Sequence, residues 1–198
     1  QVADNLAGRD IADLLHAPVL HDLQRKAAID LLSALAPCTY IGRPILFPLM
    51  SLKCLNLSLR YGNTEESCFA YSCYGVMLVS IYADTAAGYA FSELAIALNE
   101  RFGDMKLRGS VLHVHGSNIN FWRNHIAHDL PILDRAFAAC LAAGDLVYGN
   151  YVAFQSIWHA LEMGKPLPDG ARYADTRAEF ATKTKNDMVL ETIRIEQQ

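Results

Sequence analysis

A short glycine-containing phrase returns in this chain at a constant interval. Gly62, Gly103 and Gly144 are each 41 residues apart, and each follows an apolar run and precedes Asn or Asp. Glycine can end a helix in the left-handed conformation, and Asn or Asp can cap the next helix. A repeat of this length is typical of one helical hairpin, which buries its apolar face by stacking on its neighbours. The interval therefore predicts an all-α fold, a right-handed superhelix of stacked antiparallel helical hairpins.

The interval also makes a prediction about domain organisation. Its next position is Lys185, which is not glycine but lies in a polar break before Asn186. We expect one α-solenoid domain over residues 1–198, because neighbouring repeats share a continuous core. No methionine precedes Gln1, and residues 1–21 resemble the tail of a preceding hairpin. We therefore expect an internal fragment of a longer chain.

Apolar spacing and capping residues place the expected helices. These are 22–36, 44–60 or 48–60, 63–82, 85–101, 105–122, 129–142, 146–163, 170–182 and 187 onward, with a break at 164–170. Pro37 is expected to end the first helix and begin a loop over 38–43. Asn63, followed three residues later by Glu66, fits a capping box, and Asp84 is expected to cap the helix after it.

Composition and motifs argue against several classes of function. The chain is 52% hydrophobic, yet its longest uncharged run, residues 68–83, falls short of the roughly 20 residues that span a membrane, so we expect a buried helix there. A net charge of −4 without a Lys/Arg cluster argues against nucleic-acid binding. The five cysteines have no CxxC spacing and are expected to be core residues in a reducing, cytoplasmic compartment. No nucleotide-binding loop or nucleophile motif is present, so no catalytic residue and no cofactor is expected.

The histidines suggest a metal site only remotely. His113 and His115 are two residues apart on an expected helix, so their side chains point about 200° apart. His125 and His128 lie in a loop without an accompanying acidic pattern. A histidine-based metal-dependent enzyme is thus a remote alternative.

Aromatic residues at helical spacing are mostly expected to wedge helices together in the core. A few could line the concave surface on which such proteins bind partners. The candidates for a surface that binds a protein or peptide are Trp122, Arg123, His125, Trp158 and His159.

Several phrases carry a family resemblance. They are residues 14–18, 46–50, 56–63, 69–71 with 74–75, 119–125, 144–148 and 189–198. The chain resembles the helical-repeat region of large bacterial hybrid signalling proteins, in which a serine/threonine-kinase-like domain and an AAA-type ATPase module precede the repeats and a GAF domain and a histidine kinase follow them. It is also similar to tetratricopeptide arrays, although their usual period is about 34 residues. We describe the expected fold as tetratricopeptide-like.

The resemblance implies a non-catalytic sensory or scaffolding solenoid. Its partners would be the flanking ATPase and kinase domains of the same chain, with a protein or peptide ligand on the concave face. The alternative is a passive spacer, or a dimerisation or adaptor module without a ligand, which could form a homodimer.

Overall fold

The computed structural model describes residues 1–164 and 166–197, and in these ranges every regular element is a helix. The chain divides into two compact units, Gln1–Leu107 and Arg108–Gln198. The first unit contains α1 (Val2–Leu6), the 3-10 helix η1 (Ala12–His16), α2 (Leu23–Ala34), α3 (Ala36–Gly42), α4 (Leu46–Tyr61), α5 (Ser67–Tyr82) and α6 (Thr85–Phe102). The second contains α7 (Arg108–Asn118), η2 (Asn120–Trp122), η3 (Ile126–His128), α8 (Asp129–Ala143), α9 (Leu146–Glu162), α10 (Leu167–Lys183) and α11 (Asp187–Glu196).

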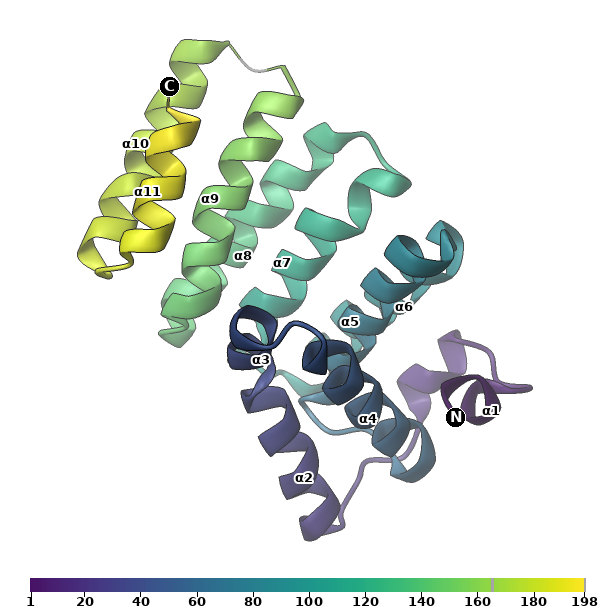
Figure 1. The fold of residues 1–198 in the computed structure, drawn as a ribbon. Helices are drawn as coiled ribbons and strands as arrows, with labels where there is room; N and C mark the ends of the chain where they lie inside the picture. The colour runs from purple at the N-terminus through teal and green to yellow at the C-terminus, as the bar shows by residue number, and fades with distance from the viewer. Residues whose placement is uncertain (165, 198) are drawn as a thin grey trace. The chain divides into compact units, whose positions relative to one another are not determined.

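Helix α5 is the centre of the first unit. It packs against α4 and α6, and also touches α2 (Figure 1). Every residue from Ser67 to Cys73 is buried, so this part of the helix is enclosed on all sides. This confirms the buried helix expected for the uncharged run. The exposed side chains of Ile81 and Tyr82 lie only in its last turn.

The first unit differs from the expectation between α2 and α4. The loop predicted over residues 38–43 is wrong, because α3 occupies Ala36–Gly42. Pro37 lies in the first turn of α3, where its missing N–H costs nothing, and so it begins a helix as well as following one. The prediction that all five cysteines are core residues is wrong for Cys38, which is exposed on α3, and the other four are buried as predicted.

The capping box predicted at the start of α5 is also wrong. Helix α5 begins at Ser67, and the Thr64 N–H donates to Ser67 Oγ at 2.8 Å. Asn63 instead joins distant segments: its N–H donates to the Pro18 carbonyl at 2.8 Å and its side-chain amide to the Leu14 carbonyl at 2.9 Å. Asn63 therefore forms tertiary hydrogen bonds in place of the helix cap that the local sequence predicts.

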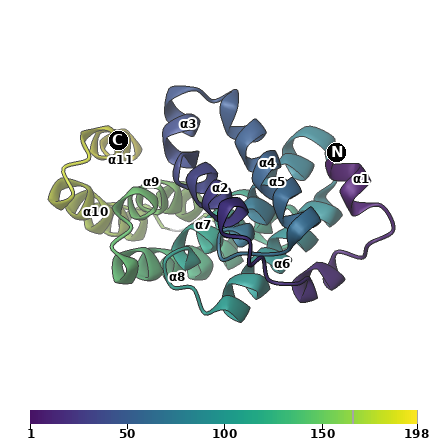
Figure 2. The same ribbon diagram turned by 90° about the horizontal axis from the view of Figure 1, so that it is seen from below.

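The second unit is a series of helices joined by short turns. Helix α8 packs on α7 and α9, and α10 and α11 both pack on α9 (Figures 1 and 2). Small and branched residues fill the interior around α9, α10 and α11; the buried members are Ala153, Ile157, Ala174, Ala181, Val189 and Ile193. Lys165, which falls in the predicted break, and Gln198, which ends the family-like closing phrase, lie outside the described residues.

The four positions spaced by 41 residues share a backbone property. Gly62, Gly103, Gly144 and Lys185 all have positive φ, at 116°, 64°, 69° and 54°. Gly103 and Gly144 end α6 and α8 in the left-handed conformation, as predicted. Asp84 caps α6 by accepting the Ala87 N–H at 2.9 Å, which was also predicted.

Of the described helices, none has the length and apolar character that crossing a membrane requires. The single continuous domain over residues 1–198 stays a prediction.

Candidate functional site

The sequence-predicted surface residues all belong to the second unit, around the turn between α7 and α8. Trp122 ends η2, Arg123 follows it, and His125 precedes η3. Trp158 and His159 lie on α9. The turn is held in place by a buried polar network at the start of α8.

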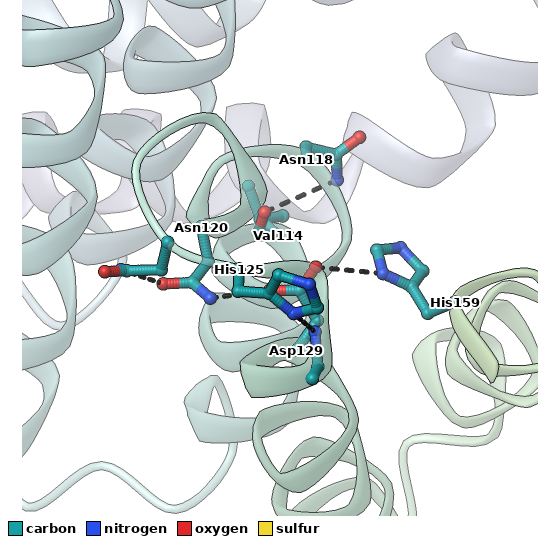
Figure 3. Close-up of polar contacts among 8 residues, drawn as sticks. Val114, Asn118, Asn120, His125, Asp129 and His159 are labelled. Carbon is teal, nitrogen blue, oxygen red and sulfur yellow. Dashed lines mark hydrogen bonds and ion pairs between the residues drawn. The ribbon is translucent and has the colours of Figure 1, made fainter. Parts of the chain in front are cut away.

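Asp129 is the centre of this network. Its side chain is 0% exposed at the first position of α8, where the positive end of the helix dipole favours an anion. Oδ1 accepts a hydrogen bond from Asn120 Nδ2 at 2.6 Å. Oδ2 lies 3.0 Å from Nδ1 of His159, which donates because a carboxylate can only accept (Figure 3). The two partners meet the cost of burying this carboxyl group.

The network extends into the turn itself. Asn124 Nδ2 donates to Asn120 Oδ1 at 2.8 Å, so the Asn120 amide both accepts from the turn and donates to Asp129. His125 Nδ1 accepts the Ala127 N–H at 3.1 Å and so caps η3. His125 thus holds backbone of the turn, while Asn120 and Asn124 link its side chains to Asp129. The turn therefore has a defined shape.

Two more histidines, His113 and His115, are buried on α7, the helix before the turn. Burial lowers the pKa of His113 to about 4, against the opposing effect of its hydrogen bond to Gln155. Burial likewise lowers the pKa of His115 to about 4, although the Asp129 carboxylate acts in the opposite direction. His113 Nε2 lies 2.6 Å from Gln155 Oε1, and His113 Nδ1 is buried without a partner. Both imidazoles are therefore neutral at pH 7.

The predicted surface residues differ in exposure. Trp122 is 55% exposed and Trp158 50%, and Arg123 and His125 are also exposed. His159 is only 6% exposed. The Phe121 ring contacts both Trp122, at 5.5 Å between ring centroids, and His159, at 5.9 Å. The Phe121 ring therefore joins Trp122 and His159 through two aromatic contacts, and His159 supports the surface from the interior.

The arrangement is suited to holding and presenting side chains. Asp129 binds Asn120 of the turn and His159 of α9, and so links the segment that carries Trp122 to α9. Within residues 1–164 and 166–197, no group of three His, Cys, Asp or Glu side chains is placed to hold a metal ion.

Sequence reasoning missed Asp129 and Asn120. In the sequence, Asp129 has only the signature of a helix start, and the 30 residues that separate it from His159 carry no local pattern. A buried Asp–His contact depends on how α8 and α9 pack, so the available signal was only that both residue types need partners when buried.

No known protein-family model matches the chain. It is similar to a protein described as hybrid signal transduction histidine kinase G, from Dictyostelium discoideum, with 27% identity over 136 residues. The matched region covers 67% of this chain but only 4% of that relative. The similarity therefore indicates a region related to signal-transduction proteins, and the bacterial origin implied by the resemblance stays a prediction.

Proposed function

We propose that this chain is a non-catalytic sensory or scaffolding solenoid of a multidomain signalling histidine kinase. Its hairpins form a tetratricopeptide-like stack with a 41-residue repeat, and it couples a protein or peptide ligand to flanking ATPase and kinase domains. The observation that carries this proposal is the similarity to a hybrid histidine kinase over 136 residues. The positive φ at four positions 41 residues apart supports the repeat.

The ligand surface we propose is the turn at α7–α8 together with α9. Exposed indoles are frequent anchors of protein interfaces, because they bury a large area at a low entropic cost. Trp122 and Trp158 supply such rings, and Arg123 adds a charge. The Asp129 network holds the backbone beneath Trp122, so the surface is partly organised before binding.

Coupling would work by a population shift. A ligand that favours one curvature of the helical stack changes the state of the flanking domains only to the extent that it binds the two states with different affinity. Typical coupling free energies correspond to changes of about fivefold or more.

The first experiment concerns the parent gene. Sequencing the reading frame on both sides of Gln1 and Gln198 should reveal an ATPase module upstream and a histidine-kinase core downstream. A frame with neither domain would overturn the signalling assignment and leave a stand-alone adaptor.

The second experiment separates a sensor from a spacer. In the full-length parent, replacing Trp122 and Trp158 by alanine should change the autophosphorylation rate about fivefold or more. The matched control replaces two exposed apolar residues of the same unit outside this surface, Leu167 and Met188, by alanine. Equal rates in all three proteins, with small-angle scattering unchanged by every bound partner, would indicate a passive spacer.

A further inference from the structure

The first unit carries a groove that the predicted surface does not include. The groove has a volume of about 950 Å³ and lies between α4 and α5, with the first residues of the chain at one end. Most of its apolar lining comes from one face of each helix. These residues are Leu49, Leu52 and Leu57 of α4 and Met77, Leu78 and Ile81 of α5. Such a volume is at the upper end of small-molecule pockets and also suits a row of side chains.

The lining residues follow helical spacing on both walls. Leu49, Leu52, Asn56 and Arg60 are three or four residues apart on α4, and the same holds for Tyr74, Met77 and Ile81 on α5. Two neighbouring helices with such faces form ridges, and a third helix can lie in the furrow between them. The geometry therefore matches the groove mode of helix recognition.

The rim of the groove is unusually apolar for exposed surface. Leu49 is 62% exposed, Ile81 65% and Tyr82 70%. Large apolar side chains that gather at a groove commonly mark an interaction site. Covering them would remove these side chains from water, which favours binding.

Charge identifies the kind of partner. Lys53 and Arg60 are exposed lining residues of α4, seven residues apart, so they lie on the same side of the helix about 10 Å apart along its axis. Among the residues that the structure describes, neither forms an ion pair, and the Arg60 guanidinium lies over the Tyr61 ring at 5.3 Å. The acidic lining residue, Asp84, uses one carboxylate oxygen to cap α6.

We propose that this groove binds an amphipathic helix of a partner protein. The apolar stripe of that helix lies between α4 and α5, and two acidic residues, one or two turns apart, face Lys53 and Arg60. The end near α1 is formed by a defined contact, since Asn5 Nδ2 donates to Asn56 Oδ1 at 2.7 Å. This site shares no residue with the surface that contains Trp122 and Trp158, and the proposal does not depend on the function proposed above.

The probes are two designed 16-residue helical peptides with the same leucine stripe. One carries glutamates beside the stripe and the other carries lysines at the same positions. Fluorescence anisotropy with the 198-residue chain should show binding of the glutamate peptide about tenfold or more tighter than that of the lysine peptide. Combining Lys53→Glu with Arg60→Glu should reverse this preference.

Matched controls separate the groove from general stickiness. Arg43→Glu changes an exposed charge outside the groove and should leave the preference unchanged. Ile81→Asp should abolish binding, whereas Leu23→Asp, at an exposed leucine of α2, should not. Both apolar positions are exposed, so folding should survive, which circular dichroism would check.

Three results would overturn the proposal. The first is equal affinity for both peptides, and the second is an Arg43→Glu effect as large as that of the groove charges. The third is a wild-type dimer, measured by light scattering, that Ile81→Asp converts to a monomer while neither peptide binds. In that case the occupant of the groove is a second copy of the chain.

Discussion

Glu65 and Glu66 are neighbours in sequence with opposite electrostatic environments. A hydrogen bond from Lys26 Nζ at 2.9 Å lowers the pKa of Glu65. Burial, with a contribution from Asp30, raises the pKa of Glu66. Asp30 and Glu66 each have a buried carboxyl oxygen without a hydrogen-bond partner. Charge therefore stabilises the fold at Glu65 and destabilises it at Glu66.

The first prediction uses this pair. At pH 7 to 8, Glu66→Gln should raise the free energy of unfolding, by about 1 kcal/mol, because the variant buries no charge. Because the native pKa of Glu66 is raised, the wild-type protein keeps its full stability below pH 4.5 and loses part of it as pH rises through the native pKa. The difference in unfolding free energy between the variant and the wild type should therefore vanish in acid. Urea unfolding at several pH values measures it.

Glu65→Gln is the matched control, and it should lower the free energy of unfolding where Glu66→Gln raises it. Its lowered native pKa contributes stability above pH 4.5 that disappears as pH falls through the native value. The Lys26–Glu65 pair is more than one-third exposed, so its loss should cost only about 0.5 kcal/mol at pH 7. If Glu66→Gln were as destabilising as Glu65→Gln at pH 8, the buried-charge interpretation would be wrong.

The second prediction concerns the acid sensitivity that His113 gives to the second unit. Its native pKa of about 4 lies below the usual 6.5, so unfolding takes up a proton and stability is lost as pH falls from 6.5 to 4. This loss amounts to at most about 3 kcal/mol. His113→Gln should reduce that slope in urea unfolding monitored by circular dichroism, and the part that remains comes from His115, whose pKa burial also lowers to about 4.

His21→Gln is the control for His113, because His21 is exposed in the first unit. This variant removes a histidine outside the buried site, so the loss of slope expected for His113→Gln should not follow. The same slope in wild type and His113→Gln would show that the imidazole titrates normally in the folded protein.

At the scale of elements, two glycines with positive φ end their helices for different reasons. Gly62 follows α4 at φ 116°, and a Cβ there would lie 2.3 Å from the Pro18 carbonyl oxygen. Gly103 follows α6 at φ 64°, and nothing lies within 4 Å of the position of its Cβ. The first glycine permits a close approach of two chain segments, while the second permits only a backbone conformation.

The third prediction follows from this difference. Gly103→Ala should cost about 1 to 2 kcal/mol, the strain of the left-handed region. Gly62→Ala should cost roughly 3 kcal/mol or more, because Pro18 must also move and its hydrogen bond with Asn63 is disturbed. Equal losses in urea unfolding would argue against the contact at Pro18.

At the scale of the whole molecule, the question is whether the core is continuous. The chain has two compact units, whereas the repeat predicts one cooperative stack in which neighbouring hairpins stabilise each other. The fourth prediction is that Ile157→Ala, which should cost about 2 to 5 kcal/mol at a buried position of α9, also speeds amide exchange in α5.

Hydrogen exchange followed by mass spectrometry measures this coupling. Leu167→Ala, at a residue 75% exposed on α10, is the control and should change exchange little. Faster exchange confined to residues 108–198 would instead mean that the two units unfold independently.

The sequence by itself determined the features that depend on residues close to one another in the chain. Apolar spacing and turn residues predicted most of the helices, the left-handed glycines after α6 and α8, and the Asp84 cap, because these depend on neighbours within about one turn. The same reasoning named Trp122 and Trp158 as surface candidates, and the structure shows both exposed, whereas His159, named with them, is buried.

Only the tertiary structure decided the features that depend on distant partners. Asn63 forms hydrogen bonds with Leu14 and Pro18 and does not cap α5. Asp129 contacts His159, which is 30 residues away in the sequence. The groove between α4 and α5 exists because faces of these two helices lie side by side, with the first residues of the chain also lining it. Burial and hydrogen bonding between remote segments decide these contacts, and no short window of sequence contains both partners.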